Sequence, residues 1–215
     1  MDNLQKIVYR RHSTRSFDPD YIICRQQQED ILKAGLRAPS PKNRQPWSFV
    51  VLDQKADIQR ASLILIEQTQ IFKEKRKLTH SDTEDLDMAK TTAEIIKDVS
   101  MLVLICYVRD EKNEHGDSMD WPLSAQAFEV ADIQSIGACI ENMILMAESM
   151  DISSLWICDV LYAESRLSKA FNLQWPLVSA VAFGKASPLH TPRYSLDMKA
   201  TWFDADKKEL SSGIM

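Results

Sequence analysis

Two periods of hydrophobic and polar positions alternate along the chain, and they predict helices interleaved with strands. Apolar residues at Leu4, Ile7 and Val8 have helical spacing and predict a short first helix. Four more segments are expected to be helical: residues 26–38, 55 to about 73, roughly 125–150, and 163–171. Four runs rich in β-branched and aromatic residues predict strands: residues 47–52, 101–108, 153–158 and 177–184.

Long helices mixed with separated strands predict the α+β class, with a sheet packed against helices. The helix expected at 125–150 is apolar on nearly all faces, which is typical of a helix buried in a core or an interface. Residues 73–90 are highly charged and weakly periodic, so we expect an exposed loop or a mobile cap there, within a cap region of about 73–98. About 186–215 is polar with scattered aromatics and is expected to be a C-terminal arm that lies on another surface, such as a partner subunit.

Composition and charge narrow the class of protein. The chain has 215 residues, of which 45% are hydrophobic and 27% charged, and no repeat or linker divides it, so we expect one domain over 1–215. A net charge of -5 argues against a nucleic-acid partner, which needs a broad basic surface. The longest apolar run, residues 101–108, is far shorter than the ~20 residues that span a bilayer. Without a secretion signal or a membrane span, the expected location is the cytoplasm.

Histidines and cysteines show no pattern that indicates a metal site or a nucleophile. The four histidines form neither a triad nor a set of metal ligands. The four cysteines lack CxxC or zinc spacing, and they are expected to be free thiols in a reducing compartment: Cys24, Cys106, Cys139 and Cys158.

A cluster of cations and hydroxyls follows the first predicted helix, in YRRHSTRSF at residues 9–17. In an extended segment Arg11, Ser13 and Arg15 point the same way. Arginine forks match phosphate oxygens, and a serine hydroxyl adds a neutral hydrogen bond. The cluster alone leaves two readings open, an anion site or a solvated basic helix end.

A second notable segment, APSPKNRQPWSF at residues 38–49, connects a predicted helix to a predicted strand. It carries the hydrogen-bonding side chains of Ser40, Asn43 and Gln45 and is stiffened by prolines. Rigid loops with amides suit recognition of a planar heterocycle that has carbonyl and N–H edges. Taken alone, the segment is better explained as a turn that buries Trp47.

Together, the two segments resemble the nitroreductase family of FMN-dependent oxidoreductases, whose members have an Arg-(Arg/His)-Ser-x-(Arg/Lys) cluster and then an (A/S)PSxxNxQPWxF segment. Two later stretches agree. Residues 131–157 resemble the family's long central helix and the tryptophan-containing strand after it, and residues 181–196 resemble its late strand, glycine and downstream arginine. The resemblance spans residues 3 to about 203.

The resemblance implies a mainly antiparallel sheet packed among helices, in an intertwined homodimer with FMN at the subunit interface. It also implies that NADH or NADPH reduces the flavin, and that a nitro compound, quinone or similar small organic acceptor then takes two electrons by a ping-pong mechanism. The flavin would carry the chemistry, so no catalytic side chain is expected. Two alternatives stay open: a flavin-binding carrier or sensor with little turnover, and a specialised enzyme of the same fold for reductive dehalogenation or flavin destruction.

The resemblance also assigns roles to individual residues. Those expected to hold the FMN phosphate, ribityl chain and pyrimidine edge are Arg11, His12, Ser13, Arg15 and Arg193. Those expected to reach the flavin from the other subunit are Ser40, Pro41 and Asn43, with Arg37 a weaker candidate. Those expected beside one face of the isoalloxazine are Leu155, Trp156 and Ile157.

This chain departs from the family pattern at two sites near the expected flavin. The family's Gly-Leu-Gly before the tryptophan strand is replaced by residues 151–154, DISS, and its Ser-Gly step is Ser40-Pro41, which removes a backbone N–H. These changes leave the substrate subgroup open. Candidates for the pocket roof are residues 73–90 and three aromatics that ordinary packing also explains: Phe72, Trp121 and Phe128.

Overall fold

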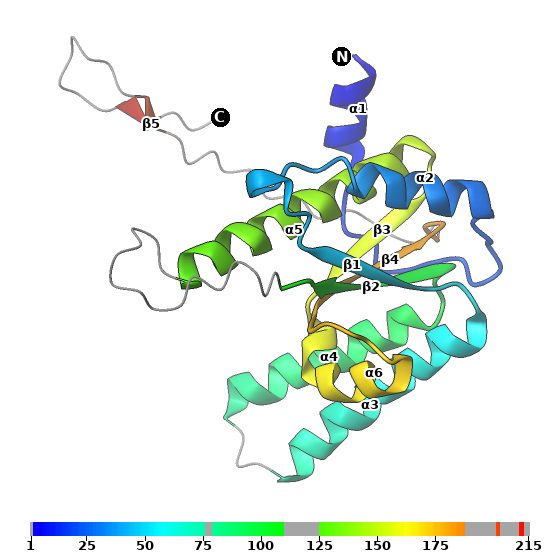
Figure 1. Cartoon of the computed structure of the whole chain (residues 1–215). Helices are drawn as coiled ribbons and strands as arrows, with labels where there is room; N and C mark the ends of the chain where they lie inside the picture. Colours follow the sequence, from blue (N-terminus) through cyan, green and yellow to red (C-terminus); the bar gives the residue numbers. More distant parts are fainter. Residues whose placement is uncertain (1, 76–78, 110–124, 188–200, 203–210, 213–215) are drawn as a thin grey trace.

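The computed structural model describes residues 2–75, 79–109, 125–187, 201–202 and 211–212 (Figure 1). A four-stranded sheet lies at its centre in the order β1-β2-β4-β3, and every neighbouring pair is antiparallel. Its strands are β1 (Trp47–Leu52), β2 (Met101–Tyr107), β3 (Ser153–Ile157) and β4 (Leu177–Gly184). Two short strands, β5 (Thr201–Trp202) and β6 (Ser211–Ser212), pair separately. The predicted α+β class and the four predicted strands are confirmed.

Helices cover both faces of the sheet (Figure 1). On one side lie α1 (Asn3–Arg10), α2 (Arg25–Gly35) and α5 (Ala125–Ser149). On the other side lie α3 (Lys55–Lys75), α4 (His80–Ile96), the 3-10 helix η3 (Asp159–Ala163) and α6 (Glu164–Phe171). A second 3-10 helix, η1 (Pro41–Asn43), precedes β1. The arrangement is therefore three layers, with the sheet between two layers of helices.

β2 contributes side chains to two hydrophobic cores, one on each face of the sheet, because it is buried along its whole length and its side chains alternate between the faces. Leu102 and Leu104 belong to the core shared with α3, α4 and α6. Met101 and Val103 belong to the core shared with α2 and α5. The near-continuous apolar run in the sequence reflects this burial on both faces.

α5 is the core helix expected at 125–150. It buries Ile136 and Met143, and a Cβ added to Gly35 of α2 would lie 2.8 Å from Met143 Cγ, so the two helices pack very closely. By length and composition α5 could also cross a bilayer, but here its inner face covers the sheet. Val130 and Ile133 on its outer side are exposed.

Residues 73–90 are mostly helical, so the predicted loop was wrong. α3 continues to Lys75 and α4 begins at His80, after a capping box in which Thr79 and Asp82 exchange side-chain and backbone hydrogen bonds. The buried residues of α4 recur at helical spacing: Leu86, Ala89, Ala93 and Ile96. Two of these four are alanines, whose weak hydrophobic signal conceals the helical period among the charged residues.

Candidate functional site

The N-terminal cluster lies directly beside the tryptophan-containing strand. Ser13 forms a parallel bridge with Ser154, and the Thr14 N–H donates to the Ser154 carbonyl at 2.9 Å. The same segment continues along the extension of β4, where Phe17 bridges Ala186. Backbone hydrogen bonds therefore bring together two groups of predicted site residues that are about 140 positions apart in the sequence.

Inside the cluster, the side chains of Arg11 and Arg15 are only loosely held. Arg11 Nε lies 3.7 Å from Glu141 Oε1 on α5, longer than a good hydrogen bond, and its side chain is 35% exposed. Arg15 is exposed and donates to the Ser13 carbonyl at 3.2 Å. Both guanidinium groups can therefore turn towards an anion without breaking a strong ion pair.

His12 is anchored at both ring nitrogens. Nδ1 lies 3.0 Å from the Arg10 carbonyl, and Nε2 lies 3.4 Å from Oγ1 of Thr14. Because a carbonyl can only accept, Nδ1 must carry the proton, so in a neutral ring Nε2 accepts from the threonine hydroxyl. Thr14 is fully buried. It was not predicted, although it lies within the cluster.

Arg10 is a structural residue, unlike its neighbours. Its Nε donates to Glu148 Oε1 at 2.6 Å, and its Nη2 lies 2.9 Å from Asp151 Oδ1. The hydrogen bond to Glu148 raises the pKa of Arg10 further above its usual range. These contacts tie the end of α1 to the end of α5, and they leave Arg11 and Arg15 as the two arginines available for a ligand.

Of the three predicted residues on β3, only Trp156 presents its side chain to the surface. Leu155 and Ile157 are buried in the core under α3 and α6. Trp156 points to the opposite face, is 42% exposed, and donates from its indole N–H to Ser179 Oγ at 2.6 Å. Ser179 in turn donates to the Ile157 carbonyl, so the indole ring is held by a fixed hydrogen-bonded partner.

The predicted 40–43 loop has an unusual backbone. Lys42, Asn43 and Gln45 have φ values of 53°, 55° and 50°, a left-handed conformation that costs a non-glycine residue roughly 1–3 kcal/mol. Ser40 Oγ accepts from the Gln45 N–H at 3.0 Å. The loop packs on the first half of α5 and borders a hollow of about 280 Å³, lined by Pro39, Ser40, Pro41, Ala131, Gln134, Ser135 and Ala138.

Arg44 in this loop forms a buried ion pair that was not predicted. Its Nε and Nη2 lie 3.1 and 2.5 Å from Oδ1 of Asp132 on α5, and both side chains are about one-tenth exposed. The Tyr107 hydroxyl donates to the other carboxylate oxygen at 3.2 Å. Burial raises the pKa of Tyr107, and the negative charge of Asp132 adds to the effect. No sequence pattern indicates this pair, because its members are 88 positions apart.

Within one chain the loop and the cluster contact different parts of α5. The hollow beside the loop is centred near Ser135, whereas Arg11 approaches Glu141, six residues further along. At ~1.5 Å per residue this separation is ~9 Å. Arg37 is exposed just after α2. Arg193 lies outside the residues that the structure describes.

The candidate roof residues do not gather over the cluster. Phe72 packs edge-on against Tyr162, with ring centroids 6.5 Å apart, in the helical layer on the other side of the sheet from Trp156. Phe128 lies beneath the guanidinium of Arg44. Trp121 is outside the described residues. The helical pair formed by α3 and α4 also lies on that far side of the sheet, away from the cluster of the same chain (Figure 1). A role for residues 73–98 as a cap stays a prediction.

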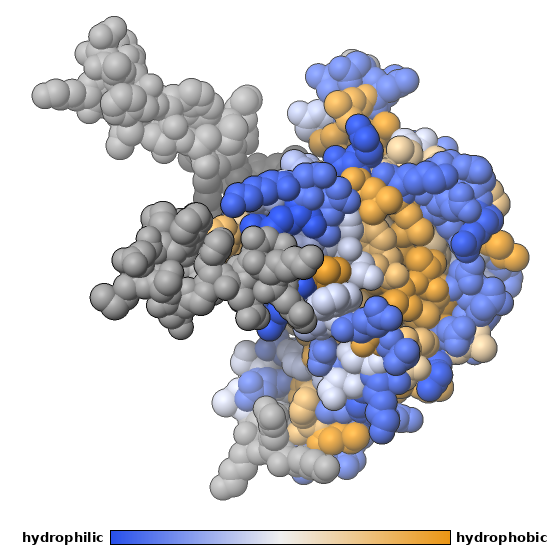
Figure 2. Space-filling view, in the orientation of Figure 1, coloured by the Kyte–Doolittle hydropathy of each residue, from blue (hydrophilic) through white to orange (hydrophobic). Residues whose placement is uncertain are grey.

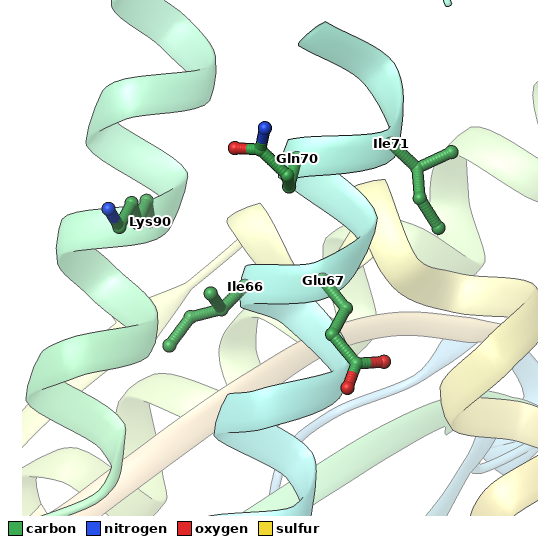
Figure 3. A pocket seen from close by; sticks show the side chains of 5 residues that line it. All are labelled: Ile66, Glu67, Gln70, Ile71 and Lys90. Carbon is green, nitrogen blue, oxygen red and sulfur yellow. The ribbon is translucent and has the colours of Figure 1, made fainter. Parts of the chain in front are cut away.

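A second hollow, of about 460 Å³, lies at the surface of α3 beside Lys90 of α4. Figure 3 shows Ile66 and Gln70 pointing towards α4, whereas Glu67 and Ile71 point away from it. Glu67 is also paired with Arg166. These diverging side chains do not form a convergent set of polar groups. Among the described residues there is also no group of three or more potential metal ligands.

Comparison with known proteins identifies the family. The model of the nitroreductase family matches residues 8–185, which include the cluster, the 40–45 loop and β3. The chain belongs to the nitroreductase family. Membership confirms the resemblance drawn from the sequence.

One relative is similar in sequence, and two solved structures share the fold. A protein of Archaeoglobus fulgidus, provisionally named an NADH dehydrogenase/NAD(P)H nitroreductase, is 25% identical over 157 residues, 73% of this chain and 68% of its own. A nitroreductase with bound FMN from Desulfitobacterium hafniense DCB-2 has a TM-score of 0.71 at 16% identity, over 95% of this chain and 100% of that one. A BluB-like flavoprotein from Clostridium difficile 630 has a TM-score of 0.68 at 22% identity, over 91% and 96%.

Proposed function

We propose that this protein is an FMN-dependent oxidoreductase that passes two electrons from NADH or NADPH to a small organic acceptor, such as a nitro compound or a quinone. The observation that carries the proposal is the backbone bridge that sets the cluster of Arg11, Ser13 and Arg15 against β3, inside the region matched by the family. The FMN-bound relative and the NAD(P)H relative supply the cofactor and the electron donor by analogy.

The residues of the cluster fit the phosphate of FMN. Two loosely held guanidinium groups and a serine hydroxyl can each donate to phosphate oxygens, and charge-assisted donors of this kind form the stronger hydrogen bonds. The loose contact between Arg11 and Glu141 is the feature that makes the fit credible, because a tight ion pair would have to break before an anion could bind. Arg193 would add a third cation.

The chain's own residues have binding and orienting roles. When bound, the flavin supplies the two-electron chemistry. Arg11 and Arg15 would bind the phosphate, and His12, whose ring is oriented by its two contacts, would bind the ribityl chain or pyrimidine edge. Trp156 forms an apolar wall on the α5 side, while Leu155 and Ile157, being buried, contribute backbone groups only.

The protein acts as a homodimer in this proposal. Figure 2 shows apolar side chains on α1 and over the β1 region, and Leu4, Val8 and Tyr9 of α1 are all exposed. Together with Val130 and Ile133 on α5, they are candidates for the surface that a second copy would cover. The separation between the loop and the cluster on α5 also suits a site in which the loop of one copy, through Ser40, Pro41 and Asn43, meets the flavin held by the other.

Electron transfer is expected to follow a ping-pong order, in which the oxidised nicotinamide leaves before the acceptor enters the same pocket. The free state of the described cysteines fits a reducing compartment, and we place the reaction in the cytoplasm. Initial rates should give parallel double-reciprocal lines when the NADH or NADPH concentration is varied at several fixed concentrations of a quinone or nitroaromatic acceptor. Intersecting lines would contradict the ping-pong order.

The decisive test is the absorption spectrum of the purified protein, before and after NADH or NADPH is added without oxygen. A flavin band that bleaches supports the proposed reductase. A flavin band that persists would replace it with a carrier or sensor. No flavin binding, even after FMN is added, would refute the cofactor assignment. Size-exclusion chromatography with light scattering tests the dimer in the same preparation.

A further inference from the structure

The 42–45 loop is strained and is nevertheless firmly placed. Three of its four residues, Lys42, Asn43 and Gln45, have positive φ although none is glycine. Such a conformation persists only where the surroundings enforce it, and it is found preferentially at ligand sites. The side chains of these three residues are exposed, and the hydrogen bonds that Asn43 and Gln45 make to each other and to Ser40 stay within the loop, so they do not fix it to the rest of the fold. The fourth residue of the loop, Arg44, is the one whose side chain points into the protein.

Arg44 ties the loop to two different layers of the fold. Its fork contacts Asp132 on α5, whose second oxygen accepts from Tyr107 at the end of β2, and its guanidinium lies 5.4 Å from the centroid of the Phe128 ring. The carboxylate is therefore held by the sheet on one side and holds the loop on the other. The Val108 N–H also donates to the Pro46 carbonyl at 3.1 Å, just after the loop.

A buried ion pair of this kind is not explained by stability. Apolar side chains of similar volume generally stabilise a protein as well or better, because burying two charges is unfavourable. What this pair adds is a defined geometry, because two guanidinium nitrogens contact Oδ1 of Asp132 while the Tyr107 hydroxyl contacts Oδ2. The residues just before this strained backbone, Pro39, Ser40 and Pro41, form one wall of the hollow against α5.

We infer that Arg44 and Asp132 are positioning residues for the cofactor site. Their ion pair holds the strained loop in the conformation in which Ser40 to Asn43 meet the flavin of the second copy. This inference rests on the proposed function. It goes beyond it by assigning the preorganisation of the loop to two residues that do not touch the cofactor.

The test removes both charges together, with Arg44→Met and Asp132→Asn in one protein. The asparagine oxygen still accepts from Tyr107, and no unpaired charge remains buried. Hydrogen exchange of the apoprotein, followed by mass spectrometry, should show amides of the 40–45 segment exchanging at least tenfold faster. The dissociation constant of FMN, from quenching of its fluorescence, should rise about tenfold. The visible circular dichroism of bound FMN should change as well.

Two further variants frame this result. Arg44→Lys keeps the charge but not the fork, so it should show the same changes to a smaller extent. Arg166→Met removes the ion pair with Glu67 on the far side of the sheet and should leave exchange in the loop and FMN binding as in the wild type. If the double variant does not fold, Arg44→Lys decides the question by the same three measurements.

The outcomes separate the inference from the proposed function. Failure of the wild-type protein to bind FMN would refute the proposed function, and with it the role of the pair at a flavin site. If the loop of the variants exchanges faster but their FMN affinity and circular dichroism are unchanged, the inference is wrong and the proposed function stands. Unchanged exchange in the loop would overturn it too, because the pair would then not hold the loop.

Discussion

Arg10 and Arg11 are adjacent in the sequence, yet the structure predicts opposite consequences when each is replaced by methionine. Arg10 pairs with Glu148, whose side chain is 10% exposed, and with the exposed Asp151. Arg10→Met leaves a mostly buried carboxylate without its cation. Arg11 has only a long contact with Glu141, and both of those side chains are partly exposed. Arg11→Met should therefore have little effect on folding and a large effect on FMN binding.

The magnitudes follow from the type of each contact. A hydrogen bond to a charged group is worth roughly 1.5–3 kcal/mol, and because Arg10 is half exposed we take about 2 kcal/mol for Arg10→Met. For a domain of this size the melting temperature should fall by ~4–8 °C. The partly exposed Arg11–Glu141 pair is worth less than about 1 kcal/mol to folding. Loss of its bond to phosphate should weaken FMN binding roughly ten- to a hundredfold.

The assay measures both quantities on both variants. Thermal unfolding of the apoprotein reports stability, and titration of FMN fluorescence reports affinity. Glu141→Gln is the matched variant, because it removes the carboxylate that competes with phosphate for Arg11 and should tighten FMN binding severalfold. If Arg11→Met lowers the melting temperature as much as Arg10→Met and leaves FMN affinity unchanged, the division of roles between the two arginines is wrong.

Two further predictions concern the core. Gly35→Ala should lower the free energy of unfolding in urea by about 1–3 kcal/mol, because the new Cβ overlaps Met143, even though alanine favours helix. An unchanged urea midpoint would show that α2 can move away from α5. Ellman's reagent should titrate two thiols in the folded protein and four in denaturant, because burial raises the pKa of Cys106 to about 11 and of Cys139 to about 12. Above pH ~9 the folded state keeps the protons of these two thiols while the unfolded state releases them, so the free energy of unfolding should fall as pH rises. Four fast-reacting thiols in the native protein would contradict the burial.

Hydrophobic period and local chemistry were sufficient to predict most of the secondary structure and to single out two segments of the candidate site. Every predicted strand has its counterpart, because β-branched runs buried on one or both faces are recognisable in a few residues. The basic cluster and the proline-rich loop were found because unusual residue types are concentrated in short segments. Among the described α-helices the exception is α4, where alanines pack against α3 and the dominant signal comes from charges on the exposed face.

The sequence by itself was therefore sufficient to predict most of the elements and the family, since these depend on residues close together in the chain. Only the tertiary structure decided which groups are free to bind. It pairs Arg10 with α5 and leaves Arg11 loose, it turns Trp156 outwards while burying its two neighbours, and it joins Arg44 to Asp132 across 88 positions. The physical reason is that a charge or an indole ring acquires its role from its partners and its burial, and both arise only when distant segments pack together.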